Sequence, residues 1–403
     1  MIEHKLSNVL LKPAEHLAGH DELYAFCSSP LAYDDARQAL VVDEPTDFMT
    51  FLNACSTGKW AMYCGIHEVT LSLELSGDTC EVVIKGLPAG AAADAESTVE
   101  LDRLAVEPEQ DAHARVSATI DAAGMDLVAF ELLPAGQTLL HAGSYAARVD
   151  EDRVRPVRIA LSTTTFKKEH YIVPNIELMR ASVAEDSGPI HDNFHMFVVD
   201  NGQTLDAEAL SDELVTVIPN ANVGGAGGFA RGMLAALDSK EPFTHVILMD
   251  DDVHVFPESI KRTYNLLALA SDEYADAFVN GAMLSVEQPT RLFEDVSHVL
   301  RSGKYAKLKP DHYVDRLDQV VANERENVEV EHAYGAWWFS CIPMASIREK
   351  GLPLPVFVRC DDVEYGLRSN PTYMTMNGIS VWHESFEGRP RASVDCYQYV
   401  RNF

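Results

Sequence analysis

The chain has 403 residues, with 62 acidic and 32 basic side chains and a formal net charge of −30. A field of that sign repels nucleic acid and anionic lipid surfaces, so neither is expected as a partner. The length exceeds that of one ordinary hydrophobic core and favours two domains. Seven cysteines form no CxxC pair, which is typical of a reducing compartment rather than of a disulfide or zinc framework. With no signal peptide and no apolar run long enough to span a bilayer, the sequence predicts a cytoplasmic protein.

Residues 1–150 are predicted to form an all-β sandwich or jelly roll. The segment 69–75 alternates between apolar and polar residues, 80–84 does so more weakly, and the short apolar run 126–130 follows between turn residues. Short strands at regular spacing are typical of such folds. A sandwich of this kind often binds carbohydrate, and a purely structural role fits the sequence equally well.

A charged segment at 150–156 ends in proline, and a second domain is predicted over 151–403. Buried strands are expected at 157–163, 195–202, 214–218 and 244–250, with helical stretches between some of them, such as 230–237. Alternation of this kind predicts a parallel α/β sheet, whose ligand chemistry lies at the carboxyl ends of its strands.

Three consecutive aspartates, Asp250, Asp251 and Asp252, come at the end of the strand predicted at 244–250. Adjacent carboxylates repel one another unless a cation or hydrogen bonds offset their charge. Asp250 and Asp252 occupy alternate positions, can point the same way and can share one hard cation such as Mg²⁺ or Mn²⁺. A solvated acidic turn or a helix cap is the alternative interpretation of this run taken alone.

Two further segments have spacing that fits ligand chemistry. The glycine-rich segment 220–232 is predicted as a turn before a helix whose amino end would favour phosphate, although it is neither a Walker A loop nor a Rossmann fingerprint. A structural turn is its alternative. Asp361 and Asp362 open an amphipathic stretch, where a carboxylate is a suitable general base for an acceptor hydroxyl. Capping of the helix by Asp361 is the alternative there.

Aromatic and imidazole side chains complete the set. Trp337 and Trp338 are adjacent and could form a platform for sugar stacking or a buried core pair. His383 follows a predicted strand, as the aspartates do. Neutral imidazole is a common metal ligand, although an isolated histidine is more often structural.

In this order, the motifs resemble those of inverting GT2 glycosyltransferases with the GT-A fold, and among them the polymerising galactofuranosyltransferases of actinobacterial cell-wall galactan. The resemblance covers most of the chain, including the β-rich amino-terminal part. The shared segments are the run from Thr163 to Lys167, an NxGGxGGF segment, the three aspartates, the tandem tryptophans followed by Ile342 and Pro343, a DDxxYGLR helix and the final Trp-His pair.

The resemblance implies a UDP-sugar donor, a glycan or lipid-linked glycan acceptor, and Mn²⁺ or Mg²⁺ as cofactor. Asp250, Asp252 and His383 would bind the metal. Asp362 would be the catalytic base, with Asp361 beside it holding the acceptor. Contacts to the nucleotide sugar are implied for Thr165, Asn222, Arg231, Asp250 and Asp251, and contacts to the acceptor for Trp337, Trp338 and Glu294.

Two departures from the family pattern bear on these expectations. Lys167 and Lys168 stand where the family usually has an arginine after Thr-Phe-x, so nucleotide contacts there are open. The chain also ends where the family's helical carboxyl-terminal region begins, and that region is expected to be absent, which leaves processivity and membrane docking open. A homo-oligomer and an indirect contact with the inner face of the plasma membrane are both compatible with the sequence.

Other functions stay open at this point. Within family GT2, a rhamnosyltransferase or another hexosyltransferase is the alternative. From other classes, a non-catalytic glycan-binding protein acting through the sandwich and a nucleotidyltransferase are the alternatives. The tandem tryptophans and the late DDxxYG helix argue against a nucleotidyltransferase.

Overall fold

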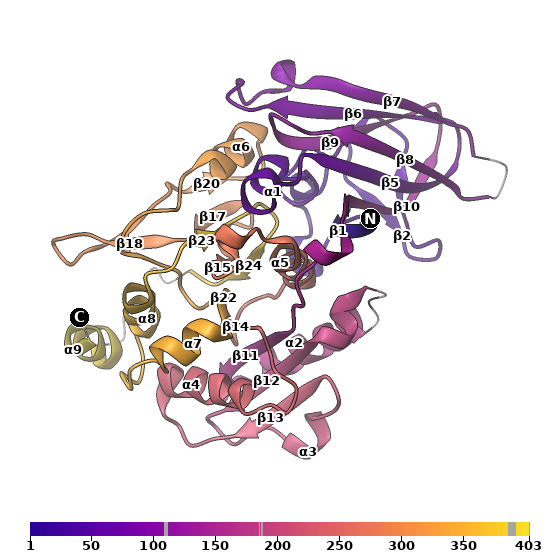
Figure 1. Cartoon of the computed structure of the whole chain (residues 1–403). Helices are drawn as coiled ribbons and strands as arrows, with labels where there is room; N and C mark the ends of the chain where they lie inside the picture. Colours follow the sequence, from indigo (N-terminus) through magenta and orange to yellow (C-terminus); the bar gives the residue numbers. More distant parts are fainter. Residues whose placement is uncertain (109–111, 185, 187, 386–391, 403) are drawn as a thin grey trace.

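The computed structural model describes residues 1–108, 112–184, 186, 188–385 and 392–402. The amino-terminal part consists of two antiparallel sheets that pack face to face, and the rest of the chain forms an α/β unit below it in the view of Figure 1. The predicted order, a β-rich part followed by an α/β part, is confirmed. The boundary at residue 150 stays a prediction.

The amino-terminal sandwich is built from long strands whose alternate side chains are buried. Phe48 and Phe130 stack between its sheets with their ring centroids 4.4 Å apart. One sheet has the order β2-β3-β10-β5-β8, with β1 also paired to β10, and the other has the order β4-β9-β6-β7. The strands are β1 (Ile2–Asn8), β2 (Ala32–Asp34), β3 (Ala39–Val42), β4 (Thr46–Asp47), β5 (Glu68–Gly77), β6 (Cys80–Pro88), β7 (Val99–Val106), β8 (Ala114–Asp121), β9 (Met125–Pro134) and β10 (Thr138–Val149).

The expectation that this part is entirely β is wrong in one place, because helix α1 (Thr57–Cys64) lies within it. Its buried residues Trp60, Tyr63 and Cys64 recur at helical spacing. Gly65 ends the helix in the left-handed conformation at φ 63°. The phenol of Tyr63 donates a hydrogen bond to the carbonyl of Thr375, so α1 faces the α/β unit.

A seven-stranded sheet with the order β13-β12-β11-β14-β22-β15-β23 forms the centre of the α/β unit. The first four strands are parallel, and their register places Thr164 beside Asp250 and Thr165 beside Asp200 at the carboxyl edge. The four predicted strands are therefore found, with ends that differ by at most two residues. The bounds are β11 (Ile159–Thr165), β12 (Phe194–Asp200), β13 (Val215–Pro219), β14 (His245–Asp250), β15 (Phe278–Asn280), β22 (Ser340–Pro343) and β23 (Tyr373–Met374).

Two small sheets and the remaining helices complete the α/β unit. The two sheets have the orders β20-β17-β16-β24 and β19-β18-β21 (Figure 1). Their strands are β16 (Ala282–Ser285), β17 (Arg291–Glu294), β18 (Ser297–Val299), β19 (Tyr305–Lys307), β20 (His312–Tyr313), β21 (Ala333–Tyr334) and β24 (Ser380–His383). The helices are α2 (Glu169–Met179), α3 (Ala207–Leu210), α4 (Gly224–Leu237), α5 (Pro257–Leu269), α6 (Leu317–Arg325), α7 (Met344–Lys350), α8 (Asp361–Ser369) and α9 (Tyr399–Asn402).

The glycine-rich segment predicted as a turn is instead the beginning of α4. A Cβ atom at Gly228 would overlap the side chain of Thr164, and one at Gly232 would overlap that of Ser162. Both contacts are made with β11, so these two glycines allow the helix to lie unusually close to the central strand. Gly224 has a φ of 73° and abuts the carbonyl of Phe357, in the loop before α8.

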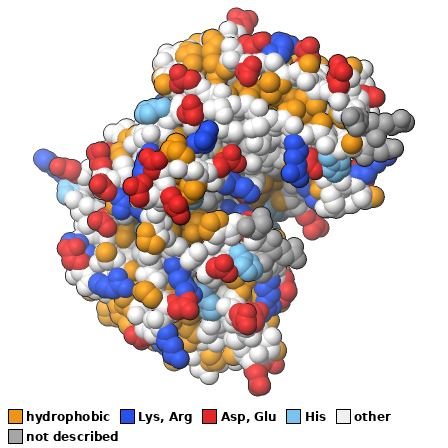
Figure 2. Space-filling model, turned by 45° about the vertical axis from the view of Figure 1, so that its right-hand side comes forward, with side chains coloured by type: hydrophobic (Ala, Val, Ile, Leu, Met, Phe, Trp, Pro, Cys, Tyr) orange, Lys and Arg blue, Asp and Glu red, His pale blue; other side chains and the backbone are white. Residues whose placement is uncertain are grey.

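The sandwich and the α/β unit share buried contacts. Asn8 donates to Glu258 at 2.8 Å, and Ser56 donates to Glu324 at 2.6 Å. One apolar cluster joins Leu17, Tyr24 and Phe51 to side chains of α6, β16, β17 and β24. Acidic and basic side chains are interspersed over the face shown in Figure 2. No helix of the described residues is long and apolar enough to cross a bilayer.

Candidate active site

A cleft of about 690 Å³ opens at the carboxyl edge of the parallel strands. It gathers side chains from loops and strand ends that are more than two hundred residues apart in the chain. Nine of the residues predicted from the sequence line it: Asp250, Asp251, Asp252, Glu294, Trp337, Trp338, Asp361, Asp362 and His383. The sheet topology therefore brings the two predicted carboxylate groups to a single cavity.

Asp250, Asp252 and His383 form a cluster with metal-ligand chemistry. One potential ligand atom from each lies within 4.8 Å of the others. Asp250 is the last residue of β14, and His383 is the last residue of β24. The Nδ1 atom of His383 lies 2.6 Å from the carbonyl oxygen of Glu384 and is the natural donor of that hydrogen bond, which turns Nε2 toward Asp252 at 3.2 Å. Such a contact fixes the ring orientation that a metal ligand requires.

The charges of this cluster are strongly coupled. Burial and the charge of Asp252 raise the pKa of Asp250 to about 7. Burial opposes ionisation of Asp252, but its contacts with His383 and Lys168 outweigh that cost and lower its pKa. The same carboxylates raise the pKa of His383 against the effect of burial. A set of acidic groups held this close is stabilised by added positive charge.

Lys168 supplies positive charge at this site, a role that was not predicted from the sequence. Its ammonium lies 3.0 Å from Asp251 Oδ1 and 2.6 Å from Asp252 Oδ2. Burial opposes its charge, but these two carboxylates raise its pKa. The signal available in the sequence was the lysine pair that follows Thr165 and Phe166.

Asp361 and Asp362 are the first two residues of α8. Cys360 occupies the N-cap position with a φ of 66° and its side chain makes no cap hydrogen bond, so Asp361 is not the capping residue that the alternative made it. Burial raises the pKa of both carboxyls to about 7, and their neighbours add to the effect: Asp362 raises that of Asp361, while Asp250 and Glu294 raise that of Asp362. Burial also raises the pKa of Glu294 to about 6. These carboxyls are therefore poised to exchange protons near neutral pH.

The tandem tryptophans are both core residues and cleft residues. Each is 5% exposed, and each lines the cleft. Trp337 packs edge-on against Phe229, with ring centroids 5.3 Å apart. Trp338 donates from Nε1 to the carbonyl of Gly281 at 3.0 Å. The two alternatives, a buried core pair and a sugar-binding surface, therefore do not exclude each other, since buried rings can present an edge to a ligand.

Three residues expected to contact the nucleotide lie outside the lining of the cleft. Thr165 is buried at the end of β11, near Asp251, whose pKa is raised mainly by burial. Asn222 is exposed and accepts a hydrogen bond from the backbone of Gly224 at 3.1 Å. Arg231 is exposed on α4. Thr165 and Asn222 thus lie near the carboxyl edge, whereas Arg231 lies farther along the helix.

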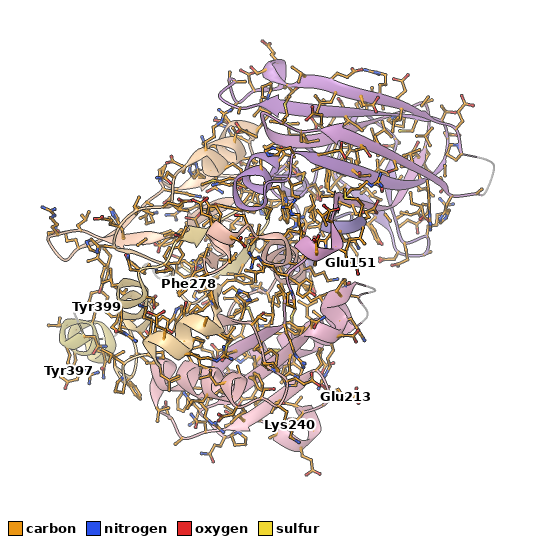
Figure 3. The ribbon with its side chains drawn as sticks, viewed as in Figure 1. Glu151, Glu213, Lys240, Phe278, Tyr397 and Tyr399 are labelled. Atoms are coloured by element: carbon orange, nitrogen blue, oxygen red, sulfur yellow. The ribbon has the colours of Figure 1, made fainter. Side chains whose placement is uncertain are left out.

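Aromatic residues that were not predicted from the sequence border the carboxylate pair of α8 in the cleft. Tyr305 and Tyr334 pack edge-on at 5.8 Å, and the phenol of Tyr305 lies 3.2 Å from the sulfur of Cys360. Tyr399 packs on Tyr305 at 5.7 Å and comes from the last part of the chain, next to α8 in Figure 3. These rings converge from β19, β21 and α9, which no local pattern could have indicated.

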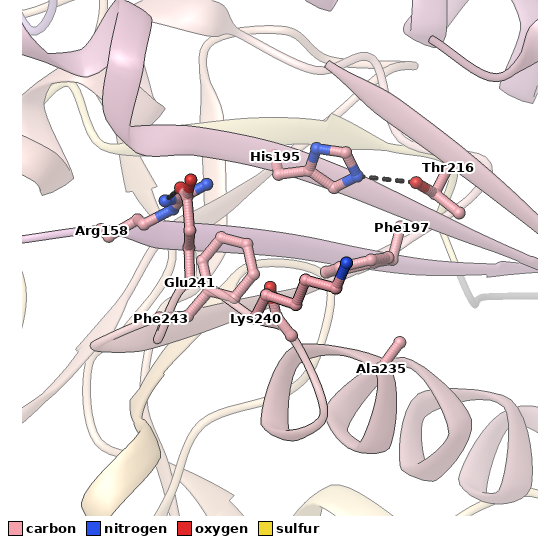
Figure 4. A pocket seen from close by; sticks show the side chains of 9 residues that line it. Arg158, His195, Phe197, Thr216, Ala235, Lys240, Glu241 and Phe243 are labelled. Atoms are coloured by element: carbon pink, nitrogen blue, oxygen red, sulfur yellow. Dashed lines mark hydrogen bonds and ion pairs between the residues drawn. The ribbon is translucent and has the colours of Figure 1, made fainter. Parts of the chain in front are cut away.

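A second hollow, of about 390 Å³, lies at the amino end of the parallel strands, on the side away from these carboxylates. Figure 4 shows the hydrogen bond between His195 and Thr216 and the ion pair between Arg158 and Glu241. Glu241 is largely exposed, and none of the predicted site residues lines this hollow. The chemistry is therefore concentrated in the larger cleft.

Comparison with known proteins agrees with this arrangement. The family described as "Glycosyl transferase family 2" matches residues 163–311. Galactofuranosyltransferase GlfT2 of Mycolicibacterium smegmatis is 27% identical and covers 98% of this chain and 63% of its own length. GlfT2 of Mycobacterium tuberculosis is 26% identical, over 92% of this chain and 60% of its own length.

The chain thus spans about three fifths of the length of these curated relatives. Among solved structures, mannosyltransferase PcManGT from Pyrobaculum calidifontis, in complex with GDP-Man and Mn²⁺, is 12% identical. It covers 60% of this chain and 61% of its own, with a TM-score of 0.38. The α/β unit has the GT-A type of fold expected from the sequence, and the chain carries a glycosyltransferase domain of family 2.

Proposed function

We propose that this protein is an inverting, metal-dependent glycosyltransferase that moves a hexosyl unit, galactofuranosyl, from a UDP-sugar to a hydroxyl group of a cell-wall or surface glycan. The similarity to galactofuranosyltransferases over nearly the whole chain supports the donor sugar. The observation that carries the proposal is the geometry of the cleft. It sets a cluster with metal-ligand chemistry opposite a carboxylate pair whose pKa values lie near neutrality.

Asp250, Asp252 and His383 fit a divalent cation. Their donor set, two carboxylates and one imidazole, suits Mn²⁺ and, through its oxygen atoms, Mg²⁺. The second oxygen of Asp251 is buried without a hydrogen-bond partner, which leaves further negative charge to be offset. When bound, Mn²⁺ or Mg²⁺ would neutralise charge on the diphosphate of the donor.

In the proposed reaction, Asp362 accepts the proton of the acceptor hydroxyl. The oxygen forms a bond to the anomeric carbon as the bond from that carbon to the diphosphate breaks. UDP leaves with the electron pair of the broken bond, and a single displacement inverts the anomeric centre. Burial, together with the like charges of Asp250 and Glu294, raises the pKa of Asp362 to about 7, so its basicity is high enough for this transfer near pH 7.

The acceptor is proposed to lie along the side of the cleft formed by the tryptophans and tyrosines. Trp337, Trp338 and Tyr334 all line the cleft beside the carboxylate pair. Aromatic faces and edges suit the C–H groups of a sugar, and the buried setting holds the rings in fixed orientations. Both a free glycan and a lipid-linked glycan present such a sugar.

The proposal is tested by a transfer screen with several nucleotide sugars in the presence of Mn²⁺ or Mg²⁺, together with calorimetric titration of UDP. Asp362→Asn should abolish turnover and leave metal-dependent UDP binding intact. Glu364→Gln is the matched control, because Glu364 lies on the same helix but pairs with Arg368 away from the cleft. Turnover retained by Asp362→Asn would exclude the base assignment.

Failure of the wild-type protein to bind UDP with any divalent cation would favour a glycan-binding module instead. One observation argues against that alternative. Among residues 1–108 and 112–150, no phenylalanine, tyrosine or tryptophan side chain is exposed and only Phe26 and Tyr33 are half-buried, so the sandwich offers few rings on which a sugar could stack.

A further inference from the structure

His16, in the amino-terminal part, contacts the segments that carry the proposed metal ligands. This residue lies in the short helix η1 (Glu15–Leu17), before the strands β2 to β10 begin. Its ring stacks on that of His254 with centroids 4.7 Å apart and planes inclined by 17°. It also meets the ring of Trp382 edge-on at 5.3 Å. One side chain of the amino-terminal part thus contacts two residues of the α/β unit.

Both partners of His16 are neighbours of predicted metal ligands in the chain. His254 comes two residues after Asp252, and Trp382 directly precedes His383. The backbones of His254 and Trp382 also form an isolated β-bridge, with nitrogen-to-oxygen distances of 2.7 Å and 3.2 Å. This bridge ties the segment that carries the aspartates to the strand that carries the histidine ligand.

The residues around the bridge are closely packed. The indole of Trp382 is fully buried, donates to the carbonyl of Pro289 at 2.9 Å and packs against Phe256 at 5.5 Å. Leu17, next to His16, belongs to the same apolar cluster as Trp382. Burial and the adjacent His254 lower the pKa of His16 to about 4, so the stacked ring is uncharged at neutral pH.

We propose that His16 is a positioning residue through which the amino-terminal sandwich braces the bridge between His254 and Trp382, and thereby holds Asp252 and His383 at the spacing that the divalent cation requires. This inference rests on the proposed metal site. It gives the sandwich a part in catalysis that needs no carbohydrate binding, since its contribution is to the affinity of the cation.

The experiment measures the affinity for Mn²⁺ of the full chain by electron paramagnetic resonance, from the signal of free Mn²⁺. His16→Ala removes the stacked ring and should weaken Mn²⁺ binding about three- to tenfold, the range expected for loss of one stacked ring pair. His16→Phe keeps a planar ring and should restore the affinity to within about twofold of wild type. Loss of donor affinity at limiting Mn²⁺, with kcat unchanged at saturating Mn²⁺ and donor, should accompany the effect in His16→Ala.

His113→Ala is the matched control. His113 also stacks on a histidine, His141, with centroids 4.0 Å apart, but within the sandwich and away from the cleft. This variant should bind Mn²⁺ as wild type does. Thermal unfolding of each variant, measured in the presence of a chelator, shows whether the variant is folded. Weaker Mn²⁺ binding by a folded variant can then be assigned to the loss of the stacked ring.

The outcomes distinguish the two proposals. If wild type binds Mn²⁺ and His16→Ala binds it equally well, the brace is excluded and the metal site stands. If wild type binds no divalent cation, the metal site and the brace both fail. Should His16→Ala not fold, His16→Phe decides: affinity like that of wild type supports the brace, and tenfold weaker binding in a folded His16→Phe overturns it.

Discussion

The close packing of α4 on β11 predicts opposite effects for two alanine substitutions in the same helix. A Cβ atom at Gly228 would lie 2.9 Å from the Cβ atom of Thr164 and would overlap the rest of that side chain. A Cβ atom at Gly225 would meet only Asp361 Oδ2, at 3.8 Å, which is ordinary van der Waals contact. Replacing glycine with alanine in a helix gains up to about 1 kcal/mol, whereas inserting a methyl group into a filled space costs about 1–3 kcal/mol.

Gly228→Ala should therefore lower the free energy of unfolding by about 2 kcal/mol, because the overlap is with a β-branched side chain on a central strand. Gly225→Ala should raise the free energy of unfolding by about 0.5–1 kcal/mol. Urea-induced unfolding, followed by circular dichroism without nucleotide or divalent cation, measures both. A Gly228→Ala variant as stable as Gly225→Ala would refute the conclusion that these glycines serve helix packing.

Three further predictions concern the cleft. Lys168→Met removes the ammonium beside Asp251 and Asp252 and should lower the free energy of unfolding in the presence of a chelator. The loss should be only about 1 kcal/mol, because the ammonium is only partly buried. Saturating Mn²⁺ should remove most of the difference in thermal unfolding between the variant and wild type. Lys12→Met, which breaks an exposed ion pair, is its control, and an equal loss with and without Mn²⁺ would contradict the reasoning. The rate of transfer should fall as pH drops below about 7, since protonation of the pair Asp361 and Asp362 removes the base; a flat profile from pH 5.5 to 8.5 would argue against it. Trp338→Phe loses the hydrogen bond to Gly281, whose net contribution is about 1 kcal/mol, and should raise the KM for the acceptor several-fold. UDP binding measured by calorimetry should stay the same.

Much of the fold and the larger part of the cleft could be predicted because the relevant signals are local. Apolar runs ending in acidic or polar residues identified the strands β11 to β14, and parallel strands place such endings along one edge. Asp250 and His383 were both recognised as residues at strand ends, and β14 and β24 do end at them. The order of the motifs along the chain then indicated which of these strand ends contribute to the same active site.

Features that depend on distant partners could not be predicted. The glycines of α4 were interpreted as a turn because their role appears only when Thr164 and Ser162 lie beneath them. Helix α1 is a short segment whose buried face is set by the sandwich on one side and by the α/β unit on the other. The contact of Lys168 with Asp251 and Asp252 spans more than eighty residues. In each case, a tertiary neighbour decides the structure, and the local sequence allows more than one answer.

The apolar cluster shared by the sandwich and the α/β unit has a consequence for how this protein can change over evolutionary time. A domain with a separate hydrophobic core can be gained, lost or exchanged between genes as one unit. Here Leu17, Tyr24 and Phe51 pack in the same cluster as Trp382, so removing the sandwich would expose the apolar side of the strand that ends at His383. Substitutions of buried residues among the first sixty should then be recovered in genetic screens as losses of transfer activity, although these residues lie far in the sequence from those that line the cleft. The two parts are therefore expected to be inherited and to vary together.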